Sequence, residues 1–354
     1  MRILHVITSL STGGAERLMV DLLPRLRDFG NDVSLLLFDG TRTAFYDELE
    51  QSGIKISSLS QGGNVYDIRY IGKLRKILSQ YDIVHTHNTA CQYFVSLARR
   101  LSRSKTRIVT TEHNTFNRRR EYPLLRHVDR VIYRKYDAII AISDKTWENL
   151  TAFVGNDFPI SIINNGIDLS PYADFKPNVP QPDEDVTVTM VAAFRPQKNQ
   201  DTLLKAIALL PTRYKLWLLG DGERRGELET LADSLGIKDR VTFWGNQKDV
   251  PSFIRQSNIM VLSSHWEGLS LSLLESMASR RPMIVSEVDG LRDIAGNVAV
   301  TVRHEDETQL ADAITSLATD KALYEKISSQ CHAEAMKYDI DKMAESYNNL
   351  YGNL

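Results

Sequence analysis

The sequence predicts an α/β protein of two doubly wound domains, each built on a parallel sheet with helices on both faces. Short apolar runs alternate with amphipathic stretches along the chain, which is the pattern of repeated strand–helix units. The apolar runs are nearly continuous rather than alternating, as expected for parallel strands buried on both faces. A proline-rich break near the middle of the 354 residues divides the pattern in two.

The first domain is predicted at residues 1–165. It opens with a strand over 2–7, too short for the apolar core of a signal peptide, and a helix over 15–27 with one leucine stripe. The same rhythm predicts further strands at 32–38, 82–86, 107–111, 138–142 and 160–163, and helices at 68–78 and 91–101.

An interdomain linker is predicted at 166–185. Four of the eleven prolines lie between Pro171 and Pro182, and proline interrupts both helices and strands. The second domain is predicted at 186–335, and residues 336–354 are expected to form a C-terminal helix that can pack back on the first domain. The strands of the second domain are expected at 186–192, 215–219, 241–244, 259–262, 283–285 and 298–302, and helices within it at 201–210, 227–235 and 271–279. Because ligands bind beyond the carboxyl ends of parallel strands, the deepest site is expected in a cleft between the domains.

The composition excludes several classes of protein. With 42% hydrophobic and 25% charged residues, the chain is neither disordered nor collagenous. No apolar run reaches the roughly 18 residues of a membrane span. Cys91 and Cys331 cannot form a disulfide framework, so a reducing, cytoplasmic location is expected.

The net charge of −2 conceals an asymmetry between the two halves. Residues 1–180 carry 24 Lys and Arg against 19 Asp and Glu, and residues 181–354 carry 19 against 26. The segment Arg99–Lys135 holds 12 basic and 3 acidic residues. This pattern indicates either a solvated helix face or an anionic partner, such as a phosphorylated ligand or an acidic membrane surface. Nucleic acid is disfavoured, since aromatic residues are not interleaved with the basic ones.

The most informative motif is the segment 265–275, HWEGLSLSLLE, which follows an apolar strand. Gly268 permits a tight loop and Ser270 can cap the next helix, whose first N–H groups would bind an anion such as phosphate. Glu267 and Glu275 flank this helix start, and carboxylates accept hydrogen bonds from sugar hydroxyls. The motif therefore predicts a ligand with both phosphate and hydroxyls, such as a nucleotide sugar. A surface or capping role for Glu275, or a glycosidase carboxylate pair, are the alternatives.

Two further motifs follow the first two predicted strands of the second domain. Arg195 and Lys198 come directly after the first strand of the second domain and can bind a diphosphate. Gly220-Asp221-Gly222 partly matches a dinucleotide fingerprint, but the spacing differs, so a tight turn explains it.

In the first domain, Gly13 and Gly14 follow the first strand, where a ligand can approach the backbone or a simple turn can form. His113 follows the strand at 107–111 and is expected to overlook the cleft. His85 and His87 lack a third ligand at a recognised spacing, so no metal is predicted there.

Together these residues resemble the retaining, nucleotide-sugar-dependent glycosyltransferases of family 4, which have the GT-B fold of two Rossmann-like domains facing a central cleft. The matching positions follow the family order along nearly the whole chain. They are Gly13-Gly14-Ala15-Glu16, His113, Asn165-Gly166-Ile167-Asp168, Arg195 with Lys198-Asn199, Gly220-Asp221-Gly222, and Glu267 with Glu275. The last pair has the spacing of the family's Glu-x7-Glu signature. Gly268-Leu269-Ser270 departs from the aromatic and glycine or proline residues that often follow the first glutamate.

The resemblance implies a role for each of these residues. Arg195 and Lys198 would bind the donor diphosphate, Glu275 the ribose and Glu267 the transferred sugar, with His113 near the reacting carbon. The remaining donor-binding positions would be Gly13, Gly14, Gly220, Trp244, Gly245, Asn246, Val250, Gly268, Leu269, Ser270 and Leu271.

The resemblance also implies the reaction. A hexose or N-acetylhexosamine would pass from a nucleotide-diphosphate sugar, expected to be a UDP-sugar, to a glycan or lipid-linked acceptor with retention and without a metal. Asp183-Glu184-Asp185 lies in the linker and is not a metal motif. Arg99–Lys135 would contact the inner face of an anionic membrane, or alternatively steer an anionic acceptor. A nucleotide-sugar epimerase of the same fold and a non-catalytic nucleotide- or carbohydrate-binding protein are the alternatives.

Overall fold

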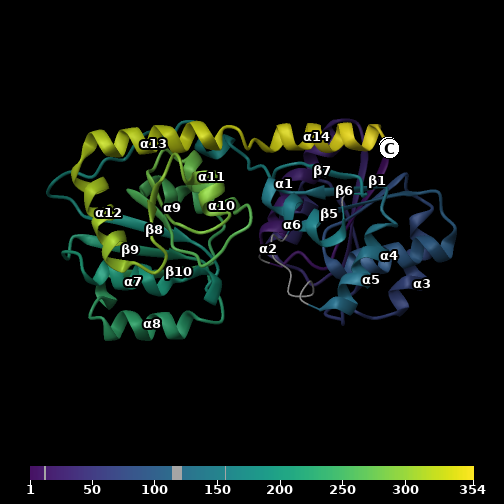
Figure 1. Cartoon of the computed structure of the whole chain (residues 1–354), viewed down its shortest axis with the longest axis horizontal. Helices are drawn as coiled ribbons and strands as arrows, with labels where there is room; N and C mark the ends of the chain where they lie inside the picture. Colours follow the sequence, from purple (N-terminus) through teal and green to yellow (C-terminus); the bar gives the residue numbers. More distant parts are fainter. Residues whose placement is uncertain (12, 114–121, 156) are drawn as a thin grey trace. The chain divides into compact units, whose positions relative to one another are not determined.

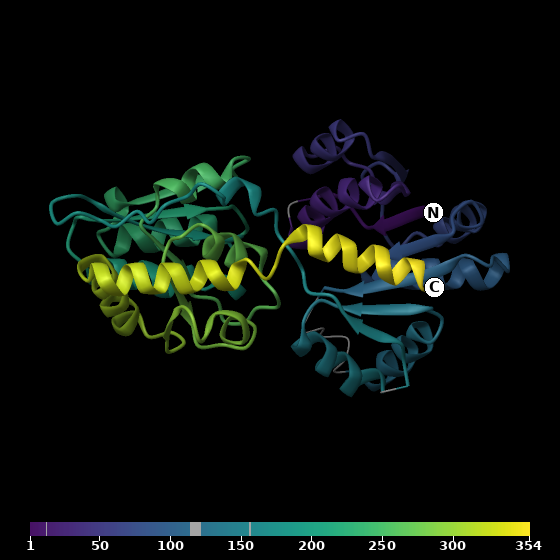
Figure 2. The same cartoon turned by 90° about the horizontal axis from the view of Figure 1, so that it is seen from above.

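The computed structural model describes residues 1–11, 13–113, 122–155 and 157–354. They form two units, and each unit is a parallel sheet covered by helices (Figure 1). Unit 1 contains Met1–Asp168 together with Ile340–Leu354, and unit 2 contains Leu169–Asp339. The chain thus passes from unit 1 into unit 2 and returns to unit 1, where both chain ends lie (Figure 2).

The sheet of unit 1 has seven strands in the order β3-β2-β1-β4-β5-β6-β7. The strands are β1 (Arg2–Ile7), β2 (Asp32–Asp39), β3 (Lys55–Ser60), β4 (Ile83–Thr86), β5 (Arg107–Glu112), β6 (Ala138–Ala141) and β7 (Ile160–Ile162). The helices are α1 (Gly14–Asp28), α2 (Ala44–Gln51), α3 (Arg69–Leu78), α4 (Thr89–Ser102), α5 (Pro123–Tyr133), α6 (Asp144–Val154) and α14 (Ile340–Gly352).

Alternate side chains along the strands of unit 1 pack into two hydrophobic cores, one on each face of the sheet. In β1, Ile3 and Ile7 pack toward α1 and α14, whereas Leu4 and Val6 pack toward the opposite core with α3 and α4. Successive side chains of a strand point to opposite faces, so an apolar run fills both cores at once. This arrangement confirms the predicted doubly wound fold.

The sheet of unit 2 has six strands in the order β10-β9-β8-β11-β12-β13. The strands are β8 (Val186–Val191), β9 (Tyr214–Leu219), β10 (Val241–Gly245), β11 (Ile259–Leu262), β12 (Met283–Ser286) and β13 (Val300–Val302). The α-helices are α7 (Gln200–Ala208), α8 (Arg225–Ser234), α9 (Val250–Gln256), α10 (Leu271–Ala278), α11 (Leu291–Ala295), α12 (Glu307–Thr319) and α13 (Lys321–Ala335), and short 3₁₀ turns include η2 (Ser170–Tyr172), η3 (Pro196–Lys198) and η4 (Lys238–Arg240).

The predicted strands of both units form within a residue or two of their predicted ends. The sequence analysis missed β3 because it is an edge strand of the sequence KISSLS, with serines in place of a continuous apolar run. Helices α2, α5, α6, α9 and α11 were also not predicted. Within the described ranges, the helices all fall short of the length and apolar character that crossing a bilayer requires.

Candidate active site

Two loops of unit 2 at the carboxyl edge of its sheet are held together by hydrogen bonds. The backbone N–H of His265 donates to the carbonyl of Gln197 at 2.8 Å, and the side-chain amide of Gln197 donates to the carbonyl of Trp266 at 2.8 Å. The hydroxyl of Ser263 donates to the carbonyl of Asn199 at 2.9 Å. These bonds fix the loop with Arg195 and Lys198 against the loop with Glu267.

Lys198 and Glu267 form a direct ion pair, with Nζ 2.6 Å from Oε1. The pair is well shielded from water, because the side chain of Lys198 is 16% exposed and that of Glu267 only 5%. The hydroxyl of Ser264 donates to the same Oε1 at 2.6 Å. A buried charge pair is tolerated only when hydrogen bonds also satisfy it, as they do here.

The turn after β12 also supports the loop that carries Glu267. Gly290 has a φ of +84°, and a Cβ added there would lie 2.2 Å from the carbonyl oxygen of Glu267. The turn after β12 therefore packs directly against the backbone of Glu267, which only glycine permits. A similar close approach occurs at Gly220, with a φ of +131°, where a Cβ would lie 2.1 Å from the carbonyl oxygen of Ala192.

Helix α10 begins beside this pair. The loop residues Gly268 and Leu269 lead into Ser270, its N-cap, and Leu271 is its first residue. The expectation that the Ser270 side chain caps the helix is wrong, because its hydroxyl bonds to the hydroxyl of Ser272 at 3.0 Å instead. Without a side-chain cap, the first N–H groups stay open to an anion. Glu275 lies half-buried further along α10.

The other predicted donor-binding residues of unit 2 lie at the ends of neighbouring strands. Arg195 is exposed and makes no ion pair with any residue that the structure describes. Gly220 and Gly245 meet through an N–H to carbonyl bond of 2.9 Å. Trp244 packs its ring against Phe253 at 4.9 Å between centroids. Gly245 ends β10, Asn246 follows it in the loop, and Val250 begins α9.

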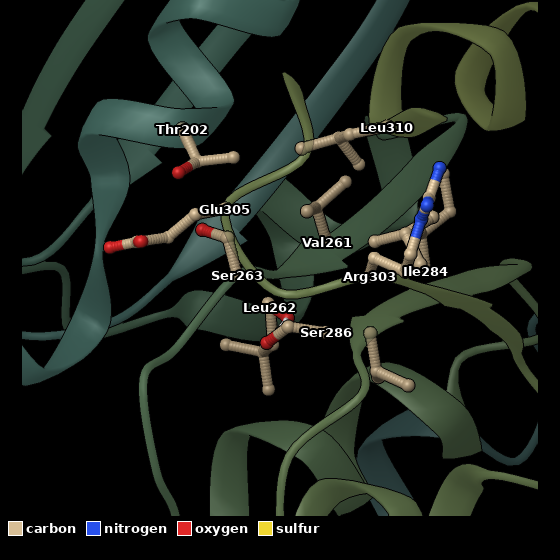
Figure 3. A pocket seen from close by; sticks show the side chains of 11 residues that line it. Thr202, Val261, Leu262, Ser263, Ile284, Ser286, Arg303, Glu305 and Leu310 are labelled. Atoms are coloured by element: carbon tan, nitrogen blue, oxygen red, sulfur yellow. Dashed lines mark hydrogen bonds between the residues drawn. The ribbon is translucent and has the colours of Figure 1, made fainter. Parts of the chain in front are cut away.

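Two cavities lie near this region, and neither is lined by the Lys198–Glu267 pair. One pocket has a volume of about 10 Å³, near the lower limit for one water molecule. Figure 3 shows the side chains that line it, among them Thr202, Ser263 and Glu305. A polar pocket of about 580 Å³ is lined by Pro196, Asn199, Asp201, Thr202, Lys205, Arg224, His265 and Glu305. Asn199 and His265 belong to the predicted motifs, whereas no motif marks Asp201, Thr202, Lys205, Arg224 or Glu305, which come from several separate segments.

Unit 1 places its candidate residues at the carboxyl edge of its own sheet. Gly13 is the N-cap of α1 and Gly14 its first residue, and a Cβ on Gly13 would lie 2.2 Å from a carboxylate oxygen of Glu16. His113 is half-buried after β5, with Nε2 3.1 Å from Nδ1 of His87. Thr12 and Asn114, which belong to the predicted motifs, lie outside the described residues.

Among the residues that the structure describes, two groups of side chains have the donor atoms of a metal site. His5, His85 and His87 are buried with ligand atoms within 4.8 Å of one another, and His265, His304 and Glu305 form a second, more exposed group. His5 is the third histidine that the sequence spacing did not reveal, because it lies on β1 opposite His85 of β4. Burial lowers the pKa of His5 to about 3 and that of His113 to about 4, so both are neutral at pH 7.

Part of the predicted basic segment Arg99–Lys135 is neutralised within the protein. Arg99 and Arg107 pair with Asp137, and Arg130 and Arg134 pair with Asp157. Arg100, Arg103, Lys105 and Lys135 are exposed and make no ion pair in the described part of the chain. Arg118, Arg119 and Arg120 lie outside the described residues.

Comparisons with known proteins cover both units. Residues 12–171 match the family described as Glycosyltransferase Family 4, and residues 172–333 match Glycosyl transferases group 1. Among curated relatives, the N-acetyl-alpha-D-glucosaminyl L-malate synthase of Bacillus anthracis is 26% identical over 81% of this chain and 79% of its own length. The UDP-Gal:alpha-D-GlcNAc-diphosphoundecaprenol alpha-1,3-galactosyltransferase of Escherichia coli is 24% identical over 99% and 96%. The crystal structure of Anabaena HepE with UDP and glucose has the same fold, with a TM-score of 0.87 and 20% identity over the whole of both chains.

Proposed function

Because the chain belongs to the glycosyltransferases of family 4 and group 1, which together match residues 12–333, we propose that it is a retaining enzyme that uses a UDP-sugar. It transfers a hexose or N-acetylhexosamine to a glycan or lipid-linked acceptor. The observation that carries this proposal is the shielded Lys198–Glu267 pair beside the uncapped start of α10. A cation and free N–H groups suit a diphosphate, and a held carboxylate suits sugar hydroxyls.

The donor is held mainly by unit 2. Lys198, Arg195 and the N–H groups of Gly268–Leu271 bind the diphosphate, Glu267 binds the transferred sugar, and Glu275 binds the ribose. Gly220, Trp244, Gly245, Asn246 and Val250 line the base pocket. For unit 1, the family resemblance supports assigning sugar contacts to His113, Gly13 and Gly14. The galactosyltransferase relative, whose name specifies a UDP-sugar and a lipid diphosphate, supports the choice of donor and acceptor.

The reaction follows the development of charge. As the bond between the sugar C1 and the diphosphate oxygen breaks, negative charge grows on the diphosphate, where the two cations and the start of α10 stabilise it. The acceptor oxygen attacks C1 from the same face and gives its proton to a phosphate oxygen of the leaving UDP. These groups supply the stabilisation that a divalent metal supplies elsewhere, so the reaction proceeds without one.

The proposal predicts a ligand response and a stereochemical outcome. UDP and UDP-hexoses should raise the melting temperature, because a ligand that binds only the folded state stabilises it. The glycosidic product should keep the anomeric configuration of the donor, as read by NMR. Absence of any stabilisation by UDP-, GDP- or ADP-sugars would argue against a transferase, and an inverted product would exclude the same-face mechanism. The stabilisation should be smaller for Glu275→Ala than for the wild type.

The acceptor reaches the enzyme at a membrane, which the protein contacts through the surface formed by α3, α4 and α5. Apolar side chains there are exposed, among them Ile68 and Leu124 at 76% each. A groove of about 450 Å³ between these helices is lined by Ile68, Leu97 and Val131, and Arg100 and Lys135 border it. Apolar contact area flanked by unpaired cations is the combination that binds anionic bilayers.

Binding to liposomes should therefore depend on lipid charge. We expect the protein to sediment with anionic vesicles and not with neutral ones, and to be released by salt. Exchanging Arg100 and Lys135 for glutamate should abolish sedimentation, whereas Lys326→Glu on the exposed face of α13 should leave it intact. Equal binding to neutral and anionic vesicles would contradict this attachment.

A further inference from the structure

A row of hydrogen-bonding side chains crosses the sheet of unit 1 under α14. His5 on β1, His85 on β4 and Thr111 on β5 lie on adjacent strands, and His5 is the direct register partner of His85. His87 follows His85 by two residues and His113 follows Thr111 by two, so all five share one face of the sheet. Tyr347 and Tyr351 of α14 cover that face.

Seven of these groups form one continuous chain with six contacts, which we call the histidine chain. Nε2 of His113 lies 3.1 Å from His87, whose other nitrogen lies 2.9 Å from Nδ1 of His5. From Nε2 of His5 the chain passes to the Tyr351 hydroxyl at 3.5 Å and then to Nδ1 of His85 at 2.5 Å. Nε2 of His85 lies 2.8 Å from the Thr111 hydroxyl, and the Thr111 hydroxyl lies 3.1 Å from the Tyr347 hydroxyl, which ends the chain.

The four histidines of this chain are neutral. Burial lowers the pKa of His5 to about 3 and that of His113 to about 4, and it places the pKa values of His85 and His87 well below the usual range. A neutral imidazole carries one N–H and one bare nitrogen, and a hydroxyl carries one proton. Each of the seven groups therefore brings one proton.

Seven protons and six contacts leave one proton over. When every contact holds one proton, the remaining proton lies either on Nδ1 of His113 or on one hydroxyl, of Thr111, Tyr347 or Tyr351, that then points away from its neighbours in the chain. Thr111, Tyr347 and Tyr351 are all buried, and within the described residues their hydroxyls have no partner outside the histidine chain. A buried donor without a partner is strongly unfavourable. Nδ1 of His113 is also buried and lacks a partner in the described part of the chain, but it belongs to a residue at the carboxyl edge of the sheet, where ligands bind.

We propose that the histidine chain fixes His113 in the tautomer with hydrogen on Nδ1, which makes this nitrogen a hydrogen-bond donor to an oxygen of the bound sugar nucleotide. Tyr347 then donates to Thr111, Thr111 to His85, His85 to Tyr351, and Tyr351 to His5. His5 donates to His87, and His87 to Nε2 of His113. His87 is thus a positioning residue for His113.

This inference rests on the proposed function for the identity of the ligand, and it adds a restriction to the mechanism. A histidine that carries hydrogen on its substrate-facing nitrogen cannot take a proton there. The acceptor hydroxyl therefore loses its proton elsewhere, in agreement with transfer to the leaving phosphate. A metal at His5, His85 and His87 would have to displace contacts that these nitrogens already make.

The test is the tautomer of His113 in the full chain, read by long-range ¹H–¹⁵N NMR of histidine-labelled protein. Free imidazole side chains favour hydrogen on Nε2, so the opposite state at His113 is diagnostic. We expect hydrogen on Nδ1 in the wild type at neutral pH, with no ligand needed. Hydrogen on Nε2 would overturn the proposal, whether or not the protein transfers a sugar.

Variants connect the tautomer to activity. His87→Leu should return His113 to the Nε2–H tautomer and lower kcat about tenfold with little change in the donor KM, as for one lost hydrogen bond in the transition state. His87→Asn, whose amide can donate to His113, should restore most of both readouts. His332→Leu in unit 2 is the matched control and should change neither. An unchanged tautomer and an unchanged kcat in His87→Leu would refute the positioning role, and the wild-type spectrum decides the tautomer even if that variant does not fold.

Discussion

Replacing Lys198 by methionine should lower kcat about 100- to 1,000-fold, the loss measured when one preorganised group is removed from developing negative charge in other enzymes. Lys198 is the shielded cation of the site, 2.6 Å from Glu267 and with little exposure to water that could take its place. The measurement is steady-state transfer from a UDP-sugar. Lys205→Met is the control, because Lys205 is exposed on the adjacent helix α7.

A double variant separates catalysis from folding. Lys198→Met alone leaves the carboxylate of Glu267 buried without its cation, which should also lower the melting temperature. Adding Glu267→Leu removes that unpaired charge and should recover the melting temperature, while kcat stays low. Recovery of kcat in the double variant would mean that the pair only holds the loop and does not act on the substrate.

Arg195→Ala should weaken turnover less than Lys198→Met. Arg195 is exposed, and water and salt screen its charge before the substrate binds. Its exposed side chain also loses conformational entropy when the substrate fixes it, and this loss offsets part of its contribution to binding. The same assay of kcat therefore compares the two cations directly.

Gly290→Ala should destabilise unit 2 by about 3 kcal/mol or more and lower kcat as well. Alanine at position 290 would have to adopt a positive φ, which is unfavourable for a residue with a Cβ. Its Cβ would also lie 2.2 Å from the carbonyl oxygen of Glu267, so the loop with Glu267 must move. Urea unfolding followed together with transfer activity checks both effects.

Gly236→Ala separates backbone strain from steric clash. Gly236 also has a positive φ, of +67°, but nothing lies within 4 Å of an added Cβ. Its replacement should cost only about 1–2 kcal/mol and leave kcat unchanged. Similar losses of stability in the two variants would show that the packing against Glu267 is not what glycine at position 290 provides.

The sequence alone predicted most of the fold because buried parallel strands are short, nearly continuous apolar runs, such as residues 2–7 and 259–262. It failed at β3, where an edge strand needs less apolar surface. The same patterns placed Arg195, Lys198, Glu267 and Glu275 on one sheet edge, since strand ends converge there.

Side-chain partners were less predictable than positions. Sequence spacing could not show that Lys198 would meet Glu267, 69 residues away, or that His5 would meet His87 across 82 residues. Nor could it show that the Ser270 hydroxyl would turn to Ser272 instead of capping α10. Such contacts depend on register between strands and on rotamers, which the order of residues fixes only through the packed fold.

The return of α14 to unit 1 has a consequence for dissecting the enzyme. The backbone N–H of Ile340 donates to the carbonyl of Ile167 at 3.0 Å, so the chain leaves unit 1 and re-enters it at neighbouring points. Leu169–Asp339 is thus a continuous insert with its two junctions side by side. A few glycines and serines could bridge that gap, yielding a miniature that keeps both tyrosines of α14 over the histidines, whereas simple truncation after Asp168 would remove them.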